Sequence, residues 1–163
     1  MNKYKTELKW GLIFAGSTLI WMLLERVTGL HDEHISQHML YTNLFAIVAI
    51  TLYVLALRDK RENDLGGDMT YKQGFISGLI ITVIVTVLSP LTQYLSATFI
   101  APDYFQNMIE FSVQEGYMAE EDASNYFSLS NYVKQSIIGA FVLGVLTSAI
   151  VAFFTKSNAP SKG

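Results

Sequence analysis

Four long stretches of the chain contain no charged residue. They cover residues 10–24, 39–57, 75–100 and 137–154, and each consists mainly of apolar side chains. A charge at the centre of a bilayer costs about 2.5–3.5 kcal/mol on insertion scales, so long runs without any charge are typical of helices that cross a membrane. The pattern therefore predicts an all-α, integral membrane four-transmembrane-helix bundle.

The interfacial residues beside these runs extend the predicted spans to residues 8–28, 38–57, 73–100 and 133–155. Residues 1–156 then form one membrane domain, and residues 157–163 form a disordered cytoplasmic tail. Ser89-Pro90 lies inside the third span, and proline removes a backbone hydrogen bond, so this helix is predicted to be kinked or tilted. The first run has no small-x-small cleavage site before Glu25-Arg26, and we interpret it as a retained helix rather than a signal peptide.

The basic residues predict the orientation, because Lys and Arg collect in cytoplasmic segments. The first and third connections hold only Arg26 and Lys134. All other basic residues flank the spans on the opposite side, and these are Lys3, Lys5, Lys9, Arg58, Lys60, Arg61, Lys72, Lys156 and Lys162. Both termini are therefore predicted to be cytoplasmic.

One extramembrane segment is long, namely residues 101–131 between the third and fourth spans. Pro102 suits the first turn of a helix, and Gly116 suits its end. Tyr104, Phe105, Met108, Ile109 and Phe111 fall mostly on one face of that helix. The segment is predicted to be an extracytoplasmic amphipathic helix, followed by a shorter helical turn over residues 120–127. It carries Asp103, Glu110 and Glu115 but no Lys or Arg within that helix, so its aromatic face should hold it against lipid or the bundle.

Composition excludes several classes of function. Only 15% of the 163 residues are charged, the formal net charge is -3, and cysteine is absent. A negative chain without a basic surface is not suited to bind nucleic acid. The lack of cysteine excludes disulfides, thiolate metal ligands and cysteine nucleophiles. The expected partners are membrane lipid and a protein partner or a second copy in a homo-oligomer, and no cofactor is predicted.

Three features resemble a known family. A lysine-bearing start leads into a span, Tyr-Lys-Gln-Gly-Phe-Ile-Ser-Gly opens the third span at residues 71–78, and Ile-Ala-Pro-Asp-Tyr begins the acidic segment at residues 100–104. In these features the chain resembles the uncharacterised bacterial membrane family catalogued as domain of unknown function 4199. The resemblance implies a small four-helix protein of the bacterial cytoplasmic (inner) membrane. It implies no catalytic residues.

The histidines form the strongest candidate site. All three lie in His-Asp-Glu-His-Ile-Ser-Gln-His at residues 31–38. On a continuous helix, His31, His34 and His38 would share one face and could approach a single metal ion, with Asp32 or Glu33 nearby. The spacing does not match the His-Glu-x-x-His signature of zinc proteases. The alternative, which we favour, is a polar and solvated start to the second span. Glu25-Arg26 is likewise interpreted as a pair of solvated charges at the interface.

A polar stripe runs along the third span at steps of three and four residues. Its members are Thr82, Thr86, Ser89, Gln93 and Ser96. Such a stripe should face the bundle, because polar groups in contact with hydrocarbon are left unsatisfied. It predicts either interhelical hydrogen bonds, which we favour, or a polar pathway for a transported solute. No ionisable residue lies within the stripe, which argues against a proton pump.

Small residues repeat at every fourth position in the last two spans. They are Gly74 and Gly78 in the third span, and Ala140, Gly144 and Ser148 in the fourth. Such faces let helix backbones approach closely. We favour contact between the two spans of one chain over dimerisation.

Together these patterns predict a non-enzymatic membrane scaffold or accessory subunit, with a small transporter or channel as the alternative and a metal-binding or enzymatic site at residues 31–38 as the third possibility.

Overall fold

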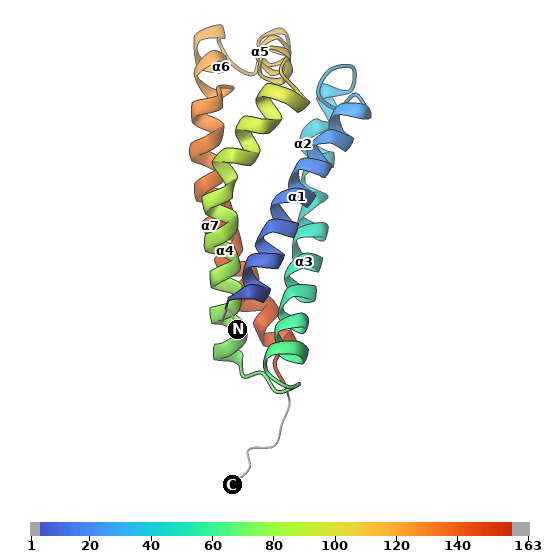
Figure 1. Cartoon of the computed structure of the whole chain (residues 1–163). Coiled ribbons are helices and arrows are strands. Elements are labelled where there is room, and N and C mark those ends of the chain that lie inside the picture. Colours follow the sequence, from blue (N-terminus) through green and yellow to red (C-terminus); the bar gives the residue numbers. More distant parts are fainter. Residues whose placement is uncertain (1–3, 158–163) are drawn as a thin grey trace.

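The computed structural model describes residues 4–157, and over this range the chain is helical with no β-strand (Figure 1). The prediction of an all-α fold is confirmed for these residues. The long helices are α1 (Lys5–Val27), α3 (Phe45–Asp59), α4 (Tyr71–Leu95) and α7 (Leu129–Thr155). The short helices are α2 (His38–Thr42), α5 (Tyr104–Gln114) and α6 (Glu120–Tyr126).

Four helical segments are long and apolar enough to cross a membrane: Lys5–Val27, Ile35–Asp64, Tyr71–Ile100 and Leu129–Thr155. The second of them extends furthest past its predicted bounds of 38–57. A short 3₁₀ helix (Ile35–Gln37) precedes α2, and a π-helical turn (Lys60–Asp64) follows α3.

Apolar side chains cover the outside of the bundle, and several hydroxyl side chains of α4 and α7 lie inside it. Val87 and Leu143 are 71% and 65% exposed, whereas Thr82 and Ser148 are fully buried. Hydrocarbon solvates Val and Leu well but offers no partner to a hydroxyl group. This distribution is the one expected of a bundle surrounded by lipid.

Small residues let α4 and α7 pack along each other at close range (Figure 1). A Cβ atom added to Gly78 would lie 2.6 Å from Ser148 Oγ, and one added to Gly144 would lie 2.5 Å from Thr82 Cγ2. Gly74 lies similarly close to Ala152, whose Cβ atom would be 3.3 Å from an added Cβ. The structure thus places the small faces of the third and fourth spans against each other within one chain.

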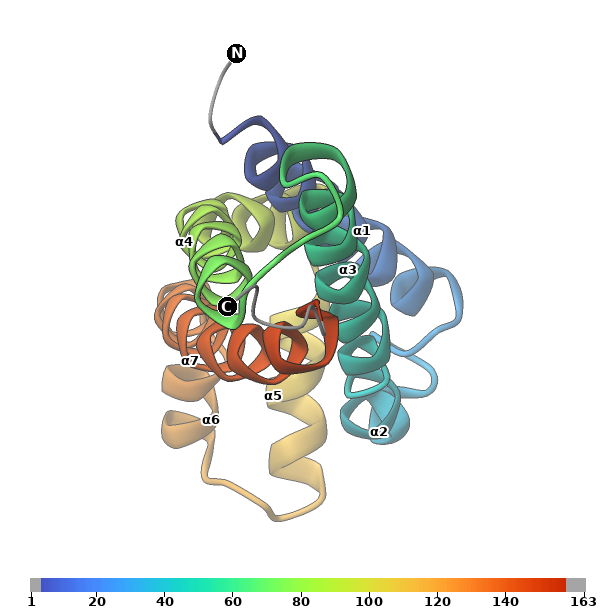
Figure 2. The same ribbon diagram turned by 90° about the horizontal axis from the view of Figure 1, so that it is seen from below.

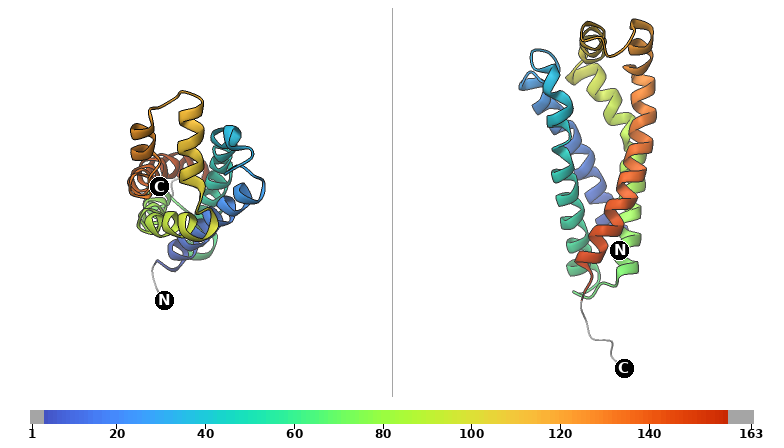
Figure 3. Two further views of the ribbon diagram at one scale, coloured as in Figure 1. Left: turned by 90° about the horizontal axis from the view of Figure 1, so that it is seen from above. Right: turned by 180° about the vertical axis from the view of Figure 1, so that it is seen from behind.

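The apolar core lies toward the end of the bundle where α7 finishes. It contains Tyr53, Ala56 and Leu57 of α3 together with Val151 and Ala152 of α7. From this end α3 and α7 diverge toward the opposite end, where α5 and α6 lie (Figure 3). Figure 2 shows the four long helices from the core end, with α5 and α6 behind them. The bundle is therefore tightly packed at one end and more open at the other.

Charged residues join the helices at the core end. Lys60 Nζ lies 2.9 Å from Glu7 Oε1, and Arg61 donates a hydrogen bond of 3.0 Å to the carbonyl oxygen of Thr155. Lys9 forms an ion pair with Asp59. These contacts place the start of α1, the end of α3 and the end of α7 at the same end of the bundle.

Of the predicted tail, 157–163, only Ser157 lies within the described residues, and its hydroxyl oxygen accepts a hydrogen bond of 2.8 Å from the backbone N–H of Met69.

The third span bends along its length, as Figure 1 shows for α4, and Pro90 lies inside this helix. Proline has no N–H group, so the carbonyl oxygen of Thr86 loses its usual helical partner. The hydroxyl of Ser89 donates to that oxygen at 2.9 Å. A π-helical turn (Ser96–Ile100) follows and leads to Ala101. Helix α5 begins three residues later, at Tyr104, and lies across the end of the bundle.

Candidate functional site

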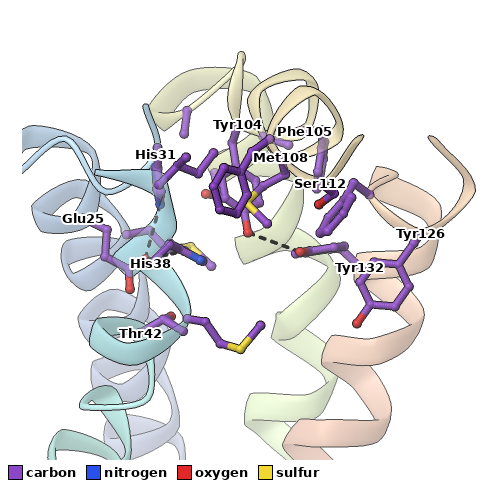
Figure 4. Close-up of a pocket in the computed structure, with 18 of the residues that line it drawn as sticks. Glu25, His31, His38, Thr42, Tyr104, Phe105, Met108, Ser112, Tyr126 and Tyr132 are labelled. Carbon is purple, nitrogen blue, oxygen red and sulfur yellow. Dashed lines mark hydrogen bonds and ion pairs between the residues drawn. The ribbon is translucent and has the colours of Figure 1, made fainter. Parts of the chain in front are cut away.

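A cavity of about 840 Å³ lies at the open end of the bundle, and α5 and α6 border it (Figure 4). One side of the cavity is formed by α1 and α2, and the other by the end of the third span and by α7. The volume falls within the range of pockets that hold small molecules. The aromatic face of α5 lines the cavity with Tyr104, Phe105, Met108 and Phe111. Of the two surfaces expected to hold this face, lipid or bundle, the structure therefore shows the bundle.

Three potential metal ligands meet on the α1–α2 side of the cavity. His31 Nε2 and His38 Nε2 lie 3.4 Å and 3.7 Å from Glu25 Oε2. The three ligand atoms all lie within 4.8 Å of one another. Glu25 and His31 are each only 4% exposed. We call Glu25, His31 and His38 the Glu-His-His cluster.

A turn between α1 and α2 brings these residues together. The chain leaves α1 after Val27, and Gly29 adopts a φ of 77°, a value that favours glycine. The backbone N–H of Leu30 then bonds back to the carbonyl oxygen of Glu25 at 2.9 Å. The chain therefore reverses directly over the end of α1, which places His31 and then His38 beside Glu25.

Glu25 is buried, so the prediction of a solvated Glu25-Arg26 pair is wrong for the carboxylate. Trp21, one helical turn earlier, donates its indole N–H to Glu25 Oε1 at 2.8 Å. Buried carboxylates require such partners, because an unpaired charge away from water is very unfavourable. The returning turn brings His31 and His38 beside the carboxylate, and the side chain is buried there.

The cluster does not include His34, which is exposed. The expected alignment of His31, His34 and His38 requires one continuous helix, but residues 28–34 form turns and residues 35–37 form a 3₁₀ helix. His34 consequently points away from the other two. Asp32 is also directed elsewhere: it is exposed and forms an ion pair with Arg26. The backbone N–H of Glu33 and the nearby Arg26 lower the pKa of Asp32.

Tyr104 of α5 packs against both histidines of the cluster. Its ring centre lies 4.9 Å from that of His31 and 5.1 Å from that of His38. Its hydroxyl is directed away from the cluster, 3.2 Å from the hydroxyl of Tyr132 on α7 (Figure 4). Burial raises the pKa of Tyr104, so the phenol stays protonated and neutral. Tyr104 is thus a wall of the site and not a ligand.

The polar stripe of the third span divides into two parts. Thr82 lies 2.8 Å from the Tyr53 hydroxyl and 3.3 Å from Ser148 Oγ, and Ser89 lies 3.3 Å from Ser136 Oγ. These are interhelical contacts. By contrast, Gln93 and Ser96 line the cavity. Within the first part, between Thr82 and Ser89, Thr86 Oγ1 is buried and has no hydrogen-bond partner among the described residues.

Two buried acidic groups were missed at the sequence level. Glu25 stands six residues before His31 on the far side of a Thr-Gly turn, and this spacing around a turn is the signal that could have found it. Glu7 is 1% exposed at the opposite end of the bundle, where its Oε1 accepts a hydrogen bond of 2.9 Å from Ser77 of α4. Its partner Lys60 follows the second span, so only the folded bundle brings the pair together.

Comparison with known proteins identifies one family. The family model described as "Protein of unknown function (DUF4199)" matches residues 9–157 of the chain. No curated protein and no solved structure matches the chain.

Proposed function

We propose that this chain, which belongs to the DUF4199 family of proteins of unknown function, is a non-enzymatic membrane accessory protein that binds a small amphipathic molecule in the cavity at the open end of its bundle. The observation that carries the proposal is the composition of the cavity wall. Glu25 and His38 supply polar groups on one side, and Phe105 and Met108 supply apolar surface on another. A molecule with a polar head and an apolar body matches this arrangement.

The proposed location is the bacterial inner membrane, with both termini in the cytoplasm and the cavity at the extracytoplasmic end. The basic residues Lys9, Lys60 and Arg61 lie together at the end of the bundle opposite α5 and α6. The excess of Lys and Arg on the cytoplasmic side of membrane proteins supports this orientation. In it, α5 and α6 form an extracytoplasmic cover over the cavity.

Native mass spectrometry of the full chain, released from its own membrane in mild detergent, tests the proposal. Ala97 lines the cavity, and Ala97→Phe should fill part of it. Val87 faces outward on the same span, so Val87→Phe adds the same bulk where lipid is expected. The wild type and Val87→Phe should carry a bound small molecule that Ala97→Phe lacks. The proposal fails if all three carry the same molecules, or if the wild type carries none.

A small transporter or channel is the second candidate, and the part of the polar stripe nearest the cavity supports it. From Gln93 and Ser96 at the cavity, the stripe continues into the bundle to Ser89 and to the Thr86 hydroxyl, which has no hydrogen-bond partner among residues 4–157. Solute flux into vesicles that contain the purified protein separates the two functions. Flux that Gln93→Leu abolishes would favour transport. Binding without flux would favour the accessory role.

A further inference from the structure

We propose that Glu25, His31 and His38 bind one divalent transition-metal ion at the edge of the cavity. This inference concerns the Glu-His-His cluster alone, and it stands whether or not the cavity also binds an amphipathic molecule. It differs from the set predicted from sequence, because a buried carboxylate on α1 takes the place of the exposed His34.

The distances within the cluster fit a shared cation, and the contact between His31 Nε2 and Glu25 Oε2 is also within hydrogen-bonding distance. Charge-assisted N–H···O bonds are usually about 2.7–2.9 Å long. The separations of 3.4 Å and 3.7 Å between Glu25 Oε2 and the two Nε2 atoms are longer than that. Ligands about 2.0–2.2 Å from a tetrahedral Zn²⁺ ion stand roughly 3.4 Å from one another. The two separations are close to this value.

The chemistry of the three groups suits a transition metal. Two imidazoles and one carboxylate form a ligand set that binds Zn²⁺ and other divalent first-row ions, with further coordination positions left open. All three residues also line the cavity, so an open position of the ion would face it. A divalent ion would in addition compensate the charge of Glu25, which is 4% exposed.

Neighbouring residues hold the ligands in place. Trp21 occupies Glu25 Oε1 with a hydrogen bond of 2.8 Å, which leaves Oε2 directed toward the histidines. Asn107 of α5 donates to the backbone carbonyl of His31 at 2.8 Å. Tyr104 packs against both imidazole rings. His31 Nδ1 is buried without a hydrogen-bond partner among the described residues, so packing and the backbone contact set the position of this ring. Orienting partners of this kind contribute about 10–100-fold to metal affinity.

The full, untagged chain in detergent is first treated with a chelator to remove bound metal. Isothermal titration calorimetry with Zn²⁺ then tests the site. The wild type should bind one ion per chain. Glu25→Gln and His38→Ala should each weaken binding by at least about 100-fold, because the first removes the negative charge of a ligand and the second removes a ligand. Trp21→Phe should weaken it by about 10–100-fold, because it removes only an orienting hydrogen bond. His34→Ala is the matched control, since His34 is a neighbouring histidine outside the cluster, and it should bind like the wild type.

A second measurement guards against variants that fail to fold. Circular dichroism should show the same helix content in every variant, and saturating Zn²⁺ should raise the melting temperature of the wild type and His34→Ala but not of His38→Ala. The proposal is overturned if the folded wild type binds no Zn²⁺. It is also overturned if Glu25→Gln and His38→Ala retain wild-type affinity, or if His34→Ala loses as much affinity as His38→Ala.

Discussion

The indole N–H of Trp21 donates to Glu25 Oε1 at 2.8 Å, one turn further along α1. This contact joins the interior of the first span to the Glu-His-His cluster. Glu25 is almost completely buried, and its second oxygen lies beside the two histidines at the edge of the cavity. A tryptophan within a helix apolar enough to cross a membrane therefore sets the direction of the carboxylate at the site.

Trp21→Phe should destabilise the folded protein by about 1.5–3 kcal/mol, the usual contribution of a hydrogen bond to a charged group. The measurement is denaturant unfolding in detergent micelles, followed by circular dichroism. The same substitution should cost less in a Glu25→Gln background, because the acceptor is then neutral. Equal costs in the two backgrounds would show that Trp21 stabilises the protein by packing and not through this hydrogen bond.

Gly78→Ala should destabilise the protein by about 1–3 kcal/mol, since the added Cβ would lie 2.6 Å from Ser148 Oγ and the helices would have to separate. Gly139→Ala is the matched control on α7, because nothing lies within 4 Å of its added Cβ. That control should be neutral or slightly stabilising. Ser148→Gly should recover part of the stability lost in Gly78→Ala. A Gly78→Ala variant as stable as the control would contradict the close approach of α4 and α7.

Pro90→Ala should straighten the third span, because residue 90 regains an N–H group that can bond to the Thr86 carbonyl. The chain has no native cysteine, so cysteines for spin labels can be added at the outward positions Val83 and Phe99 without other changes. The distance between the two labels should be longer in Pro90→Ala than in the parent protein. An unchanged distance would mean that packing and not Pro90 produces the bend.

The proposed orientation predicts which introduced cysteines a membrane-impermeant thiol reagent can reach in intact cells. Tyr117 lies exposed beyond α5, and Asp68 lies exposed between the second and third spans. Tyr117→Cys should be labelled in intact cells, whereas Asp68→Cys should be labelled only after the cells are opened. The reverse pattern would place the cavity on the cytoplasmic side.

Much of the architecture follows from local sequence. Charge-free runs mark the four spans, and the stripe from Thr82 to Ser96 marks the inward face of the third. Both inferences depend only on the unfavourable contact of charges and polar groups with hydrocarbon. The histidines also stand out in the sequence as a candidate site, but the sequence does not show which of them lie together. Helical spacing grouped His31, His34 and His38, whereas a glycine turn interrupts the helix and turns His34 outward.

Local sequence patterns predict the number of membrane-capable helices, their approximate bounds and which faces carry polar groups. These properties depend on residues within one segment and on their transfer between water and lipid. Three other features follow from the packing of the helices. Glu25 is buried and completes the cluster with His31 and His38, Glu7 lies beside Lys60, and the aromatic face of α5 borders the cavity. Each of these depends on where the chain turns and on which helices become neighbours, and no single segment encodes that geometry.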